Sequence, residues 1–476
     1  MGIKIYNTLT RKKEEFRPIK EGHIGVYVCG PTVYDIPHIG HARSAYVFDV
    51  IRRYFTYKGY KVNFVRNVTD VDDKIINKAK EEFSGEDLAG AVKKVSRKYL
   101  EDYHKYMDKL GIMQPDMEPK ATEYIEKMKA FIKILIEQGV AYASGDDVYF
   151  DVRKARDYGK LSNQSFEMLE SGARITPGEN KNDPLDFALW KSAKADEPSW
   201  HSPWGSGRPG WHIECSVMSS DILGDEFDIH GGGIDLIFPH HENEIAQSEG
   251  AGKKFARYWI HNGLLTINKE KMAKSLGNFI TIEDILAKYP ADVLKILFLQ
   301  THYSHPVDFS WEKMDEAKKA LERFYILFQK LDGSQVTRHK LQVKEKSTVE
   351  IDGFRQRFEE AMDDDFNTAE ALAVLFEFVT YINKHFKFYK SQIAELNQAV
   401  ESLMRLSNVF GLFSGEQAPA GKNEMPKEKI SDLIEQRNKA RHSKDFKTSD
   451  KIRKDLEEKG IILEDTKDGT VWRRKI

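Results

Sequence analysis

The first 70 residues change from one hydrophobic pattern to another in a regular order. Residues 24–29 form a short β-rich run that a Gly-Pro pair closes. From Pro37 the apolar residues recur at spacings of three and four, which is typical of a helix, and this pattern ends at residues 58–59, Lys-Gly. Residues 61–68 then return to strand character. A strand, a turn, a helix and a second strand form a βαβ unit, which predicts an α/β fold with a Rossmann-like, doubly wound parallel sheet.

Two separate parts of the chain contribute to this sheet domain. Residues 1–119 hold its first half and residues 210–265 its second half. Between them, residues 120–209 mix helical stretches with loops rich in Gly, Asp, Ser and Pro, so we expect an insertion that divides the domain. The ordered segments expected in the second half are strands at 211–216, 227–230 and 258–267 and a helix at 242–247.

Beyond residue 310 the chain becomes strongly helical. Residues 266–312 join the sheet domain to an all-α bundle predicted over residues 313–413. The bundle helices with apolar faces at helical spacing are 314–331, 348–362, 368–388 and 395–410. Residues 414–425 have the composition of a linker. In the small module that follows, residues 426–476, we expect helices at 427–443 and 446–460 and a hairpin of 461–464 with 470–473.

Charge is distributed unevenly along the chain. The whole sequence has 73 basic and 75 acidic residues, a net charge of −2, but residues 421–476 alone hold 16 basic and 12 acidic residues. A basic tail on an acidic body favours a nucleic-acid partner. The alternative is that these mixed charges only form solvated helical faces.

Composition also restricts the compartment. The longest apolar stretches are far shorter than the ~18 residues of a membrane span, and the N-terminal residues have no signal-peptide core, so we expect neither a membrane protein nor a secreted one. The chain has two cysteines, Cys29 and Cys215, which excludes a disulfide scaffold and favours the reducing cytoplasm.

Two histidines stand at the start of the first predicted helix. His38 and His41 flank Gly40 at the helix N-terminus, where unpaired N–H groups and the helix dipole favour phosphate. Their imidazoles can donate hydrogen bonds to phosphate oxygens, and Gly40 lets a nucleotide approach the backbone. The alternative is a pair of surface histidines that cap the helix.

Two lysines follow the last predicted strand of the sheet domain. Lys271 and Lys274 lie three residues apart in a loop with serine and glycine, which suits a clamp on a polyphosphate. Taken alone, such a pentapeptide is more typical of an exposed basic loop.

Four dispersed residues have the donor types of a zinc site. Cys29 ends the first predicted strand, and Cys215 ends a run that we expect to be a strand in the second half. His240 and Glu244 lie four residues apart, so a helix places them on one face. Two thiolates, an imidazole and a carboxylate can form a tetrahedral zinc set near strand ends, where such folds bind ligands. The alternative is two unrelated cysteines that behave as small apolar residues.

Two further segments carry weaker signals. In residues 228–235, three glycines including Gly232 allow close approach of a ligand, and His230 and Asp235 frame them; the alternative is a flexible turn. Residues 69–73 contain three aspartates, which are more typical of a helix cap than of a Mg²⁺ site.

Taken in order, these segments resemble a known family. His-Ile-Gly-His at 38–41 and Lys-Met-Ala-Lys-Ser at 271–275 resemble the two signature motifs of class I aminoacyl-tRNA synthetases. The motifs that narrow the resemblance to the cysteinyl-tRNA synthetases are Cys-Gly-Pro-Thr-Val-Tyr-Asp at 29–35, Gly-Trp-His-Ile-Glu-Cys at 210–215 and Phe-Pro-His-His-Glu-Asn-Glu at 238–244. The resemblance extends from the N-terminus through Val-Trp-Arg-Arg at 471–474, which is essentially the full chain. Ala273 departs from the family pattern, which has serine there, but both lysines remain.

The resemblance implies an amino-acid site with one zinc ion. In such an enzyme the zinc binds the thiolate of the cysteine substrate and discriminates against serine, whose hydroxyl is a poor ligand. The implied zinc ligands are Cys29, Cys215, His240 and Glu244. The residues implied to line the pocket are Thr69, Trp211 and His230, and the alternative for Trp211 is burial in the core.

The resemblance also implies an ATP site. His38 and His41 are expected to neutralise charge on the α-phosphate, and Lys271 and Lys274 to hold the β- and γ-phosphates. Gly40, Gly232 and Asp235 are expected to belong to the binding site for ATP and substrate. Mg²⁺ is expected to arrive with ATP, without a dedicated ligand in the sequence.

The implied reaction has two steps. L-cysteine and ATP form cysteinyl-adenylate and pyrophosphate, and cysteine then passes to the 3′-terminal adenosine of tRNA-Cys. The bundle and the basic module are expected to contact the tRNA, and Trp472 with residues 473–475 is a candidate for base stacking or, alternatively, the core of a hairpin. Two alternatives remain: an ATP-dependent ligase that joins cysteine to an amino sugar, and a zinc-stabilised RNA-binding protein without catalysis. We expect a monomer in the cytoplasm.

Overall fold

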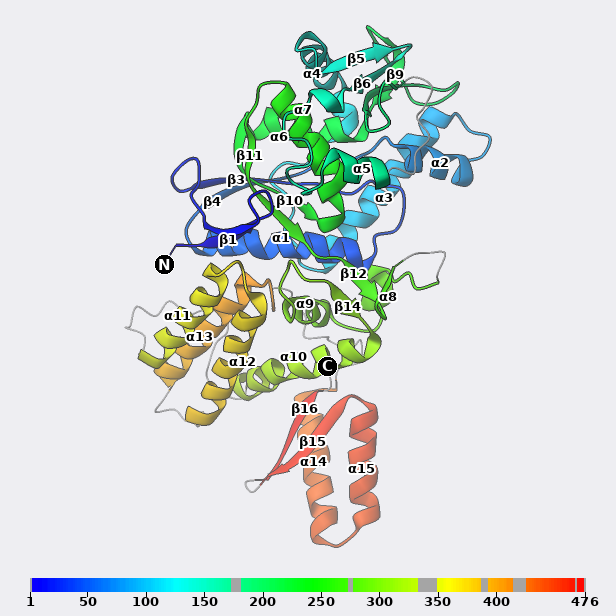
Figure 1. The fold of residues 1–476 in the computed structure, drawn as a ribbon. Coiled ribbons are helices and arrows are strands. Elements are labelled where there is room, and N and C mark those ends of the chain that lie inside the picture. The colour runs from blue at the N-terminus through cyan, green and yellow to red at the C-terminus, as the bar shows by residue number, and fades with distance from the viewer. Residues whose placement is uncertain are drawn as a thin grey trace.

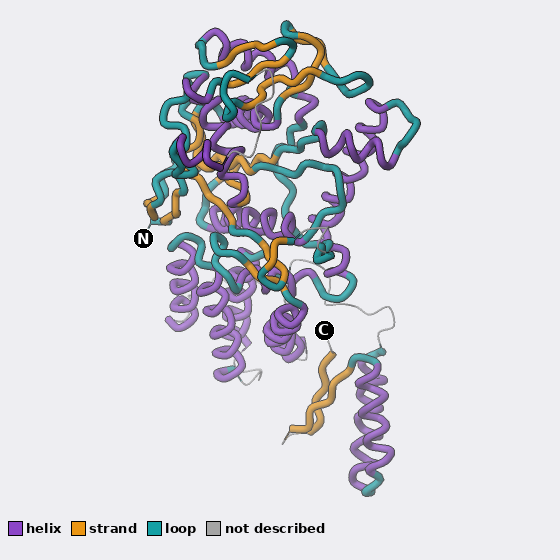
Figure 2. The backbone as a smooth tube through the Cα atoms, turned by 45° about the vertical axis from the view of Figure 1, so that its right-hand side comes forward, coloured by secondary structure: helices purple, strands orange, loops and turns teal. Residues whose placement is uncertain are grey.

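The computed structural model describes residues 2–172, 181–272, 277–332, 349–386, 393–413, 425–466 and 469–474. Figure 1 shows the insertion at the top, the sheet domain below it, the helical bundle beneath the sheet domain, and the C-terminal module at the bottom. Figure 2, turned by 45°, shows the same module standing apart from the bundle. The parts therefore follow one another along an elongated molecule.

A four-stranded parallel sheet forms the centre of the sheet domain. Its strands are β3 (His23–Val28), β4 (Lys61–Arg66), β10 (Glu226–Gly233) and β11 (Phe255–Asn262), in the spatial order β11-β10-β3-β4. The chain moves outward in one direction from β3 to β4 and in the other from β10 to β11, so the order reverses between β3 and β10. Doubly wound sheets bind ligands outside the carboxyl ends of their strands at such a reversal. The predicted fold class is confirmed.

Helices cover both faces of this sheet. On one face, α1 (Ile39–Tyr57) contributes Phe48 to a core that includes Val26 and Ile229 of the strands. On the other face, α6 (Trp211–Leu223) and α7 (Glu242–Gly250) share a core with Tyr27 and Trp259. The middle strands are thus buried on both sides, which is typical of parallel sheets.

Helix α6 corrects one prediction. The sequence predicts a strand over residues 211–216, but these residues form the first part of α6, which Gly210 precedes. Residues 213–220 of α6 are all buried, so this helix lacks the polar face that makes a helical pattern recognisable. A short apolar run cannot be assigned to helix or strand from periodicity alone.

The strand predicted over residues 258–267 is interrupted in the structure. It divides at Gly263 into the end of β11 and the start of β12 (Leu265–Ile267). A Cβ atom on Gly263 would lie 2.4 Å from the backbone of His305, so only glycine allows the two segments to approach this closely.

The insertion contains a five-stranded sheet that the sequence pattern does not predict. Its antiparallel strands, in the order β5-β6-β7-β9-β8, are β5 (Ala141–Ser144), β6 (Asp147–Phe150), β7 (Phe187–Ser192), β8 (Trp200–Ser202) and β9 (Gly205–Pro209). The helical segments are η1 (Ala121–Glu123), α4 (Ile125–Glu137), η2 (Val152–Lys154) and α5 (Phe166–Gly172). Trp190 and Phe150 build a separate core with Ile132 of α4. Strands this short carry too few alternations to be recognised between polar loops.

Smaller elements flank the central sheet. They are the hairpin β1 (Lys4–Asn7) and β2 (Lys12–Glu15), the helices α2 (Asp73–Glu82) and α3 (Leu88–Lys109), the sheet β13-β12-β14 with β13 (Glu270–Lys271) and β14 (Val307–Phe309), and the helices α8 (Ile282–Leu286) and α9 (Ala291–Leu299). Asp72 caps α2 by accepting a hydrogen bond from the backbone N–H of Lys74 at 2.9 Å. The predicted helix cap in residues 69–73 is therefore confirmed.

All four predicted bundle helices are present. They are α10 (Trp311–Asp332), α11 (Val349–Asp363), α12 (Thr368–His385) and α13 (Ile393–Val409). The bundle shares one hydrophobic core with the α1 face of the sheet domain. The Tyr46 hydroxyl of α1 also donates a hydrogen bond to the Phe410 carbonyl at 2.7 Å, which fixes the end of the bundle to the sheet domain.

The C-terminal module has a core of its own. It consists of α14 (Lys427–His442), α15 (Phe446–Glu458) and the hairpin β15 (Ile461–Thr466) and β16 (Gly469–Arg474), as the sequence predicts. Its buried apolar residues are Ile430, Ile434, Ile452, Leu456, Ile461 and Leu463. Trp472 is half-buried against them, which matches the hairpin-core alternative for this residue. Lys475 lies outside the described residues.

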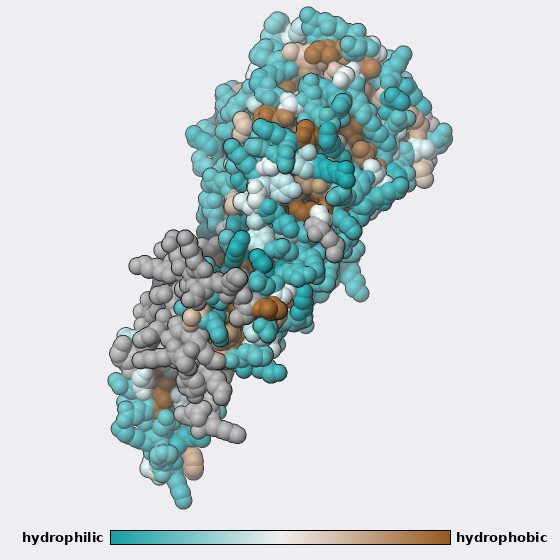
Figure 3. Space-filling model, turned by 90° about the vertical axis from the view of Figure 1, so that its left-hand side faces the viewer, coloured by the Kyte–Doolittle hydropathy of each residue, from teal (hydrophilic) through white to brown (hydrophobic). Residues whose placement is uncertain are grey.

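One face of the molecule is mainly polar (Figure 3). Figure 3 shows one face as predominantly hydrophilic, with small apolar patches separated by polar side chains. Among the residues that the structure describes, no helix combines the length and the apolar character needed to cross a membrane. The domain boundaries expected from the sequence stay predictions.

Gly30, in the turn after β3, is expected to tolerate no larger residue. A Cβ atom on Gly30 would lie 1.6 Å from the carbonyl oxygen of Asn67, a backbone atom that cannot rotate away. We expect Gly30→Ala to reduce the free energy of unfolding by about 1–3 kcal/mol, measured by urea denaturation. Gly353→Ala is the control, because Gly353 of α11 has no atom within 4 Å of such a Cβ and alanine favours a helix by ~1 kcal/mol. Equal stability of the two variants would contradict the expected clash.

Candidate metal centre and nucleotide site

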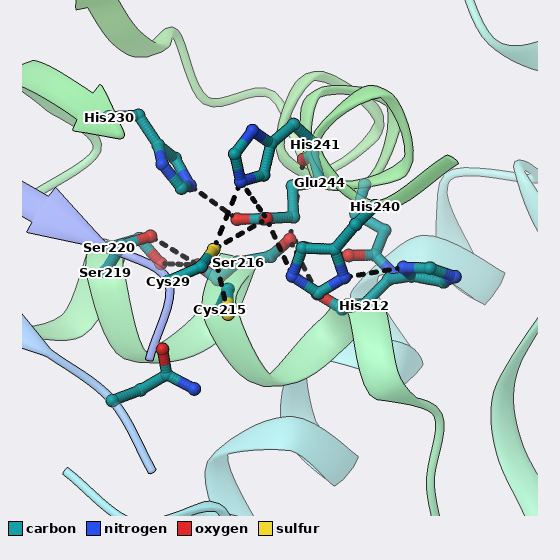
Figure 4. A network of polar contacts seen from close by, with 12 residues as sticks. Cys29, His212, Cys215, Ser216, Ser219, Ser220, His230, His240, His241 and Glu244 are labelled. Atoms are coloured by element: carbon teal, nitrogen blue, oxygen red, sulfur yellow. Dashed lines mark hydrogen bonds and ion pairs between the residues drawn. The ribbon is translucent and has the colours of Figure 1, made fainter. Parts of the chain in front are cut away.

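Four donor side chains from four segments meet beside the strand reversal. Cys29 directly follows β3, and Cys215 lies on α6. His240 lies in the π-helical segment η4 (Ile237–His241), and Glu244 lies in the first turn of α7. Their candidate ligand atoms all lie within 4.8 Å of one another (Figure 4). The structure thus brings the predicted metal set together, although Cys215 comes from a helix and not from a strand end.

The distances within this donor set are short. The Cys29 Sγ lies 3.7 Å from the Cys215 Sγ and 3.6 Å from the Glu244 Oε1, and the His240 Nε2 lies 3.1 Å from the same oxygen. Cys215, His240 and Glu244 are buried, and Cys29 is half-buried. Such a set can surround a cation of tetrahedral preference.

Burial gives these groups unusual proton affinities. It raises the pKa of the Cys29 thiol and of the Glu244 carboxyl well above their ordinary values and lowers the pKa of His240 well below its own. The protein alone therefore favours the neutral forms of all three groups. A divalent cation favours the thiolate and carboxylate forms, because it neutralises their charge. The chemistry of the donor set fits a metal cofactor.

A second donor combination overlaps the first. Cys29 and Glu244 also lie within 4.8 Å of ligand atoms of His230 and His241. The His230 Nε2 lies 2.7 Å from the Glu244 Oε2, and the His241 Nε2 lies 3.3 Å from the Cys29 Sγ. The other ring nitrogen of His241, Nδ1, lies 2.8 Å from the Nε2 of His261. His230, expected in the amino-acid pocket, is fully buried directly beside the metal set.

Trp211 and His212, the first two residues of α6, contact the ring of His240. The rings of Trp211 and His240 have centroids 4.1 Å apart, and Trp211 is 39% exposed, which excludes simple burial in the core. The His212 Nδ1 lies 3.0 Å from the His240 Nδ1 (Figure 4). Because this contact occupies one ring nitrogen of His240, the other nitrogen faces Glu244 and the metal set.

Thr69 lies beyond the end of β4 and is buried. Its hydroxyl donates a hydrogen bond of 2.6 Å to Glu214, a buried carboxyl next to Cys215 in the chain. Burial raises the pKa of Glu214 well above its ordinary value. The hydrogen bond therefore fixes the orientation of the Thr69 hydroxyl beside the α6 segment that carries Cys215.

The two signature histidines cap helix α1. The His38 Nδ1 accepts a hydrogen bond from the Gly40 N–H at 3.1 Å, and the His41 Nδ1 accepts one from the His38 N–H at 3.3 Å. Their rings stack with centroids 3.7 Å apart. A neutral imidazole that accepts at Nδ1 carries its proton on Nε2. Burial lowers the pKa of His41 to about 3, so this ring is neutral near pH 7.

The predicted lysine pair is described only in part. Lys271 ends β13, whereas Lys274 lies outside the described residues. The side chain of Met272 approaches the histidine motif: its Cε would lie 3.7 Å from a Cβ on Gly40. The segment that contains Lys271 thus starts next to the N-terminus of α1.

The glycines at the end of β10 allow close packing. A Cβ atom on Gly232 would lie 2.9 Å from the His241 ring and 3.0 Å from the Leu236 side chain. Asp235 follows in the turn η3 (Ile234–Leu236) and is exposed. A flexible turn does not account for Gly232, because its contacts exclude a larger residue.

Sequence reasoning missed three residues of this site. His212, Glu214 and His241 contact or neighbour the metal set, but none was predicted as a site residue. Each is adjacent in sequence to a predicted residue, within the segments 210–215 and 238–244. The available signal was a titratable side chain next to a predicted site residue.

Three parts of the chain match models of known protein families. Residues 15–319 match the model of the "tRNA synthetases class I (C) catalytic domain", residues 357–414 a DALR domain, and residues 426–473 a "Cysteinyl-tRNA ligase anticodon binding domain". Proteins named cysteine–tRNA ligase from Thermococcus gammatolerans and Sulfurihydrogenibium sp. are 50% and 51% identical to it. These matches cover 100% of this chain and 99% and 100% of the relatives. The chain belongs to the cysteine–tRNA ligase family.

Membership of the cysteine–tRNA ligase family confirms the resemblance, the class I fold and the ligase activity expected from the sequence. A third relative of this name, from Thermodesulfovibrio yellowstonii, is 48% identical over 100% of both chains. Because the relatives match through the C-terminal module, the alternative of a cysteine:amino-sugar ligase is not supported.

Solved structures share the ligase fold at low sequence identity. The Mycobacterium tuberculosis methionyl-tRNA synthetase in complex with methionyl-adenylate has a TM-score of 0.57 at 16% identity, with coverage of 82% of this chain and 89% of that protein. A putative arginyl-tRNA synthetase from Campylobacter jejuni has a TM-score of 0.52 at 15% identity, with coverage of 81% and 92%. At these identities the likeness concerns the fold alone.

We expect the buried hydrogen bond between Thr69 and Glu214 to contribute to the stability of this cysteine–tRNA ligase family member. Thr69→Val keeps the side-chain shape but leaves the buried Glu214 without the hydroxyl that it contacts at 2.6 Å. We expect a loss of about 1–3 kcal/mol in the free energy of unfolding, measured by chemical denaturation at pH 7. Thr69→Ser retains the hydroxyl and serves as the control. Unchanged stability of Thr69→Val would show that the pair contributes nothing.

Proposed function

We propose that this chain selects L-cysteine through a zinc ion held by Cys29, Cys215, His240 and Glu244. The observation that carries the proposal is the convergence of these four buried or half-buried donors within 4.8 Å beside the strand reversal. Two sulfur ligands and one imidazole are the donors that zinc prefers in proteins. Bound zinc would supply a strong preference for a thiolate over a hydroxyl.

Ligand chemistry, and not pocket size, then accounts for selectivity. Cysteine and serine differ in one atom, and an apolar pocket discriminates poorly between such isosteres. A site whose groups remain unsatisfied by the wrong substrate can reach factors of ~10⁴. Thr69, which follows β4 and contacts Glu214 beside Cys215, and Trp211 of α6, which contacts His240, would hold the rest of the amino acid.

For the activation step, we assign the phosphate contacts to the N-terminus of α1. The substrate carboxylate is ionised near neutral pH and attacks the α-phosphorus of ATP, so the protein needs no general base. His38 and His41 accept at Nδ1 from backbone N–H groups, and a neutral ring that accepts there carries its proton on Nε2, the atom that would donate to phosphate oxygens. Lys271 and Lys274 would hold the β- and γ-phosphates, Gly40, Gly232 and Asp235 would border the bound substrates, and Mg²⁺ would accompany ATP.

In the transfer step, a ribose hydroxyl of the terminal adenosine of tRNA-Cys attacks the cysteinyl-adenylate. The bundle and the basic C-terminal module would contact the tRNA. Arg437 of α14 is one basic residue of this module that already has a partner within the protein. Its guanidinium donates to both carboxylate oxygens of Asp465, at 2.9 and 2.8 Å. The cytoplasmic location and the monomeric state stay predictions.

Metal removal tests the selection mechanism. We expect Cys215→Ala to lose bound zinc and cysteine-dependent ATP–pyrophosphate exchange together, because the set loses one of its two sulfur donors. Zinc content is measured by atomic absorption, and exchange with cysteine and with serine is measured on the same preparations. Ser219→Ala, elsewhere on α6, is a control that should keep both properties. Discrimination between cysteine and serine by metal-free protein would disprove the proposal.

Removal of the C-terminal module tests its role in tRNA binding. Because the module has its own core, deletion of residues 424–476 should leave the rest of the chain folded. We expect pyrophosphate exchange at the level of the full chain and a loss of cysteine transfer to tRNA, measured with labelled cysteine at increasing tRNA concentration. Parallel loss of both activities would show that the module is needed for folding and not for tRNA binding.

A further inference from the structure

A buried arginine in helix α1 has no part in the functions assigned so far. Arg43 lies two residues after His41, and the residue is 1% exposed. Burial lowers the pKa of its guanidinium to about 10, so the group remains charged near pH 7. A buried charge is costly unless it is fully hydrogen-bonded, and one that makes only main-chain contacts calls for an explanation.

The Arg43 guanidinium binds three backbone carbonyls. Its Nη1 donates to the Leu264 carbonyl at 2.6 Å, and its Nη2 donates to the carbonyls of Tyr303 at 3.1 Å and His305. Leu264 stands directly before β12, and the other two residues precede β14. The planar fork of one arginine therefore joins helix α1 to two strands of the sheet β13-β12-β14 at once.

The same carbonyls hold these strands to each other. The Leu264 carbonyl also accepts the N–H of Val307 at 3.0 Å, and the Tyr303 carbonyl accepts the N–H of Gly263 at 2.9 Å. Arg43 thus contacts the junction at which β12 and β14 begin. Strand β12 pairs with β13 through Thr266 and Lys271, so the position of this junction determines the position of β13.

The segment after the lysine motif is also attached to α1. The Ile39 N–H donates to the Ile280 carbonyl, and the Ile282 N–H donates to the Pro37 carbonyl, both at 3.2 Å. The segment from β12 to Ile280 is therefore tied to the first turn of α1 at its end and to Arg43 at its beginning. Figure 1 shows β12 and α8 beside α1, consistent with these contacts.

We propose that Arg43 is a positioning residue for the activation step: it fixes the strand pair β12–β13, and with it Lys271, relative to His38 and His41. The inference rests on the proposed function, in which these residues act on opposite ends of the ATP polyphosphate. Pyrophosphate leaves before transfer to tRNA, so Arg43 affects the activation of cysteine and not the later transfer from cysteinyl-adenylate.

Lys295 provides a matched control. It is a buried cation on α9, 4% exposed, and its Nζ donates to the Gly411 carbonyl at 2.7 Å and to Asp292 at 3.1 Å. Like Arg43 it binds main chain in the interior, but it fixes the end of the bundle and does not contact β12 or β14 by these bonds. Loss of either cation removes a buried charge, so comparison of the two separates general destabilisation from loss of positioning.

The test compares Arg43→Lys, Arg43→Met and Lys295→Met in the full chain. Pyrophosphate exchange is measured against ATP concentration at saturating cysteine, and transfer is measured in a single turnover from preformed enzyme-bound cysteinyl-adenylate. We expect Arg43→Met to reduce kcat for exchange by about 100-fold with little change in the KM for ATP, because misplacement by ~1 Å can cost this factor. Arg43→Lys keeps the charge without the fork and should lose less. Transfer should be unchanged.

Two outcomes would overturn the role of Arg43. One is a parallel fall in exchange and transfer, which denotes a structural role; the other is an equal loss of exchange in Lys295→Met at equal unfolding free energy. If Arg43→Met does not fold, Arg43→Lys carries the same comparison. Lys271→Ala distinguishes failure of this inference from failure of the proposed function. Normal exchange in Lys271→Ala overturns the proposed phosphate roles. Slow exchange in Lys271→Ala together with normal exchange in both Arg43 variants overturns only the positioning role of Arg43.

Discussion

The close approach of two thiols, an imidazole and a carboxyl around Cys29 is the constraint on which the rest of the site depends. In a dry interior these groups resist ionisation, and the thiolate and carboxylate forms repel one another unless a cation lies between them. The four donors come from the end of β3, from α6, from η4 and from α7, and Cys29 directly follows β3. The set therefore exists only when both halves of the sheet domain have assembled. The insertion separates these halves in the sequence, so any change in it that alters how the halves pack also alters the metal set.

Helix α1 relates this site to the remaining parts of the molecule. Its first turn carries the stacked His38 and His41, its second turn the buried Arg43, and its third turn Tyr46, which holds the end of the bundle at Phe410. A helix is stiff over this length, so displacement at one of these contacts changes the others. The sheet domain, the β13-β12-β14 sheet and the bundle are thus all held in position by contacts with helix α1.

Much of this organisation could be predicted from the sequence, for physical reasons that differ between segments. Amphipathic helices such as α10 and α12 carry a clear spacing, and the parallel strand β3 is a continuous apolar run. Helix α6 was mistaken for a strand because residues 213–220 are buried on all sides, which removes the polar face. The short strands of the insertion offered too little alternation. Residue types and spacing indicated the donor set, but no local pattern could reveal Arg43, whose partners are carbonyls about 220 to 260 residues away.

The six buried apolar side chains of the C-terminal module form a core that is separate from the one beneath α1. A module with a core of its own does not melt as one cooperative unit with the rest of the chain, so heat absorption on warming is divided between more than one transition and a single Tm does not describe the protein. Whichever part opens first does so without the other. Partial thermal damage or a proteolytic nick between the parts would then separate recognition of the nucleic acid from consumption of ATP within the same polypeptide.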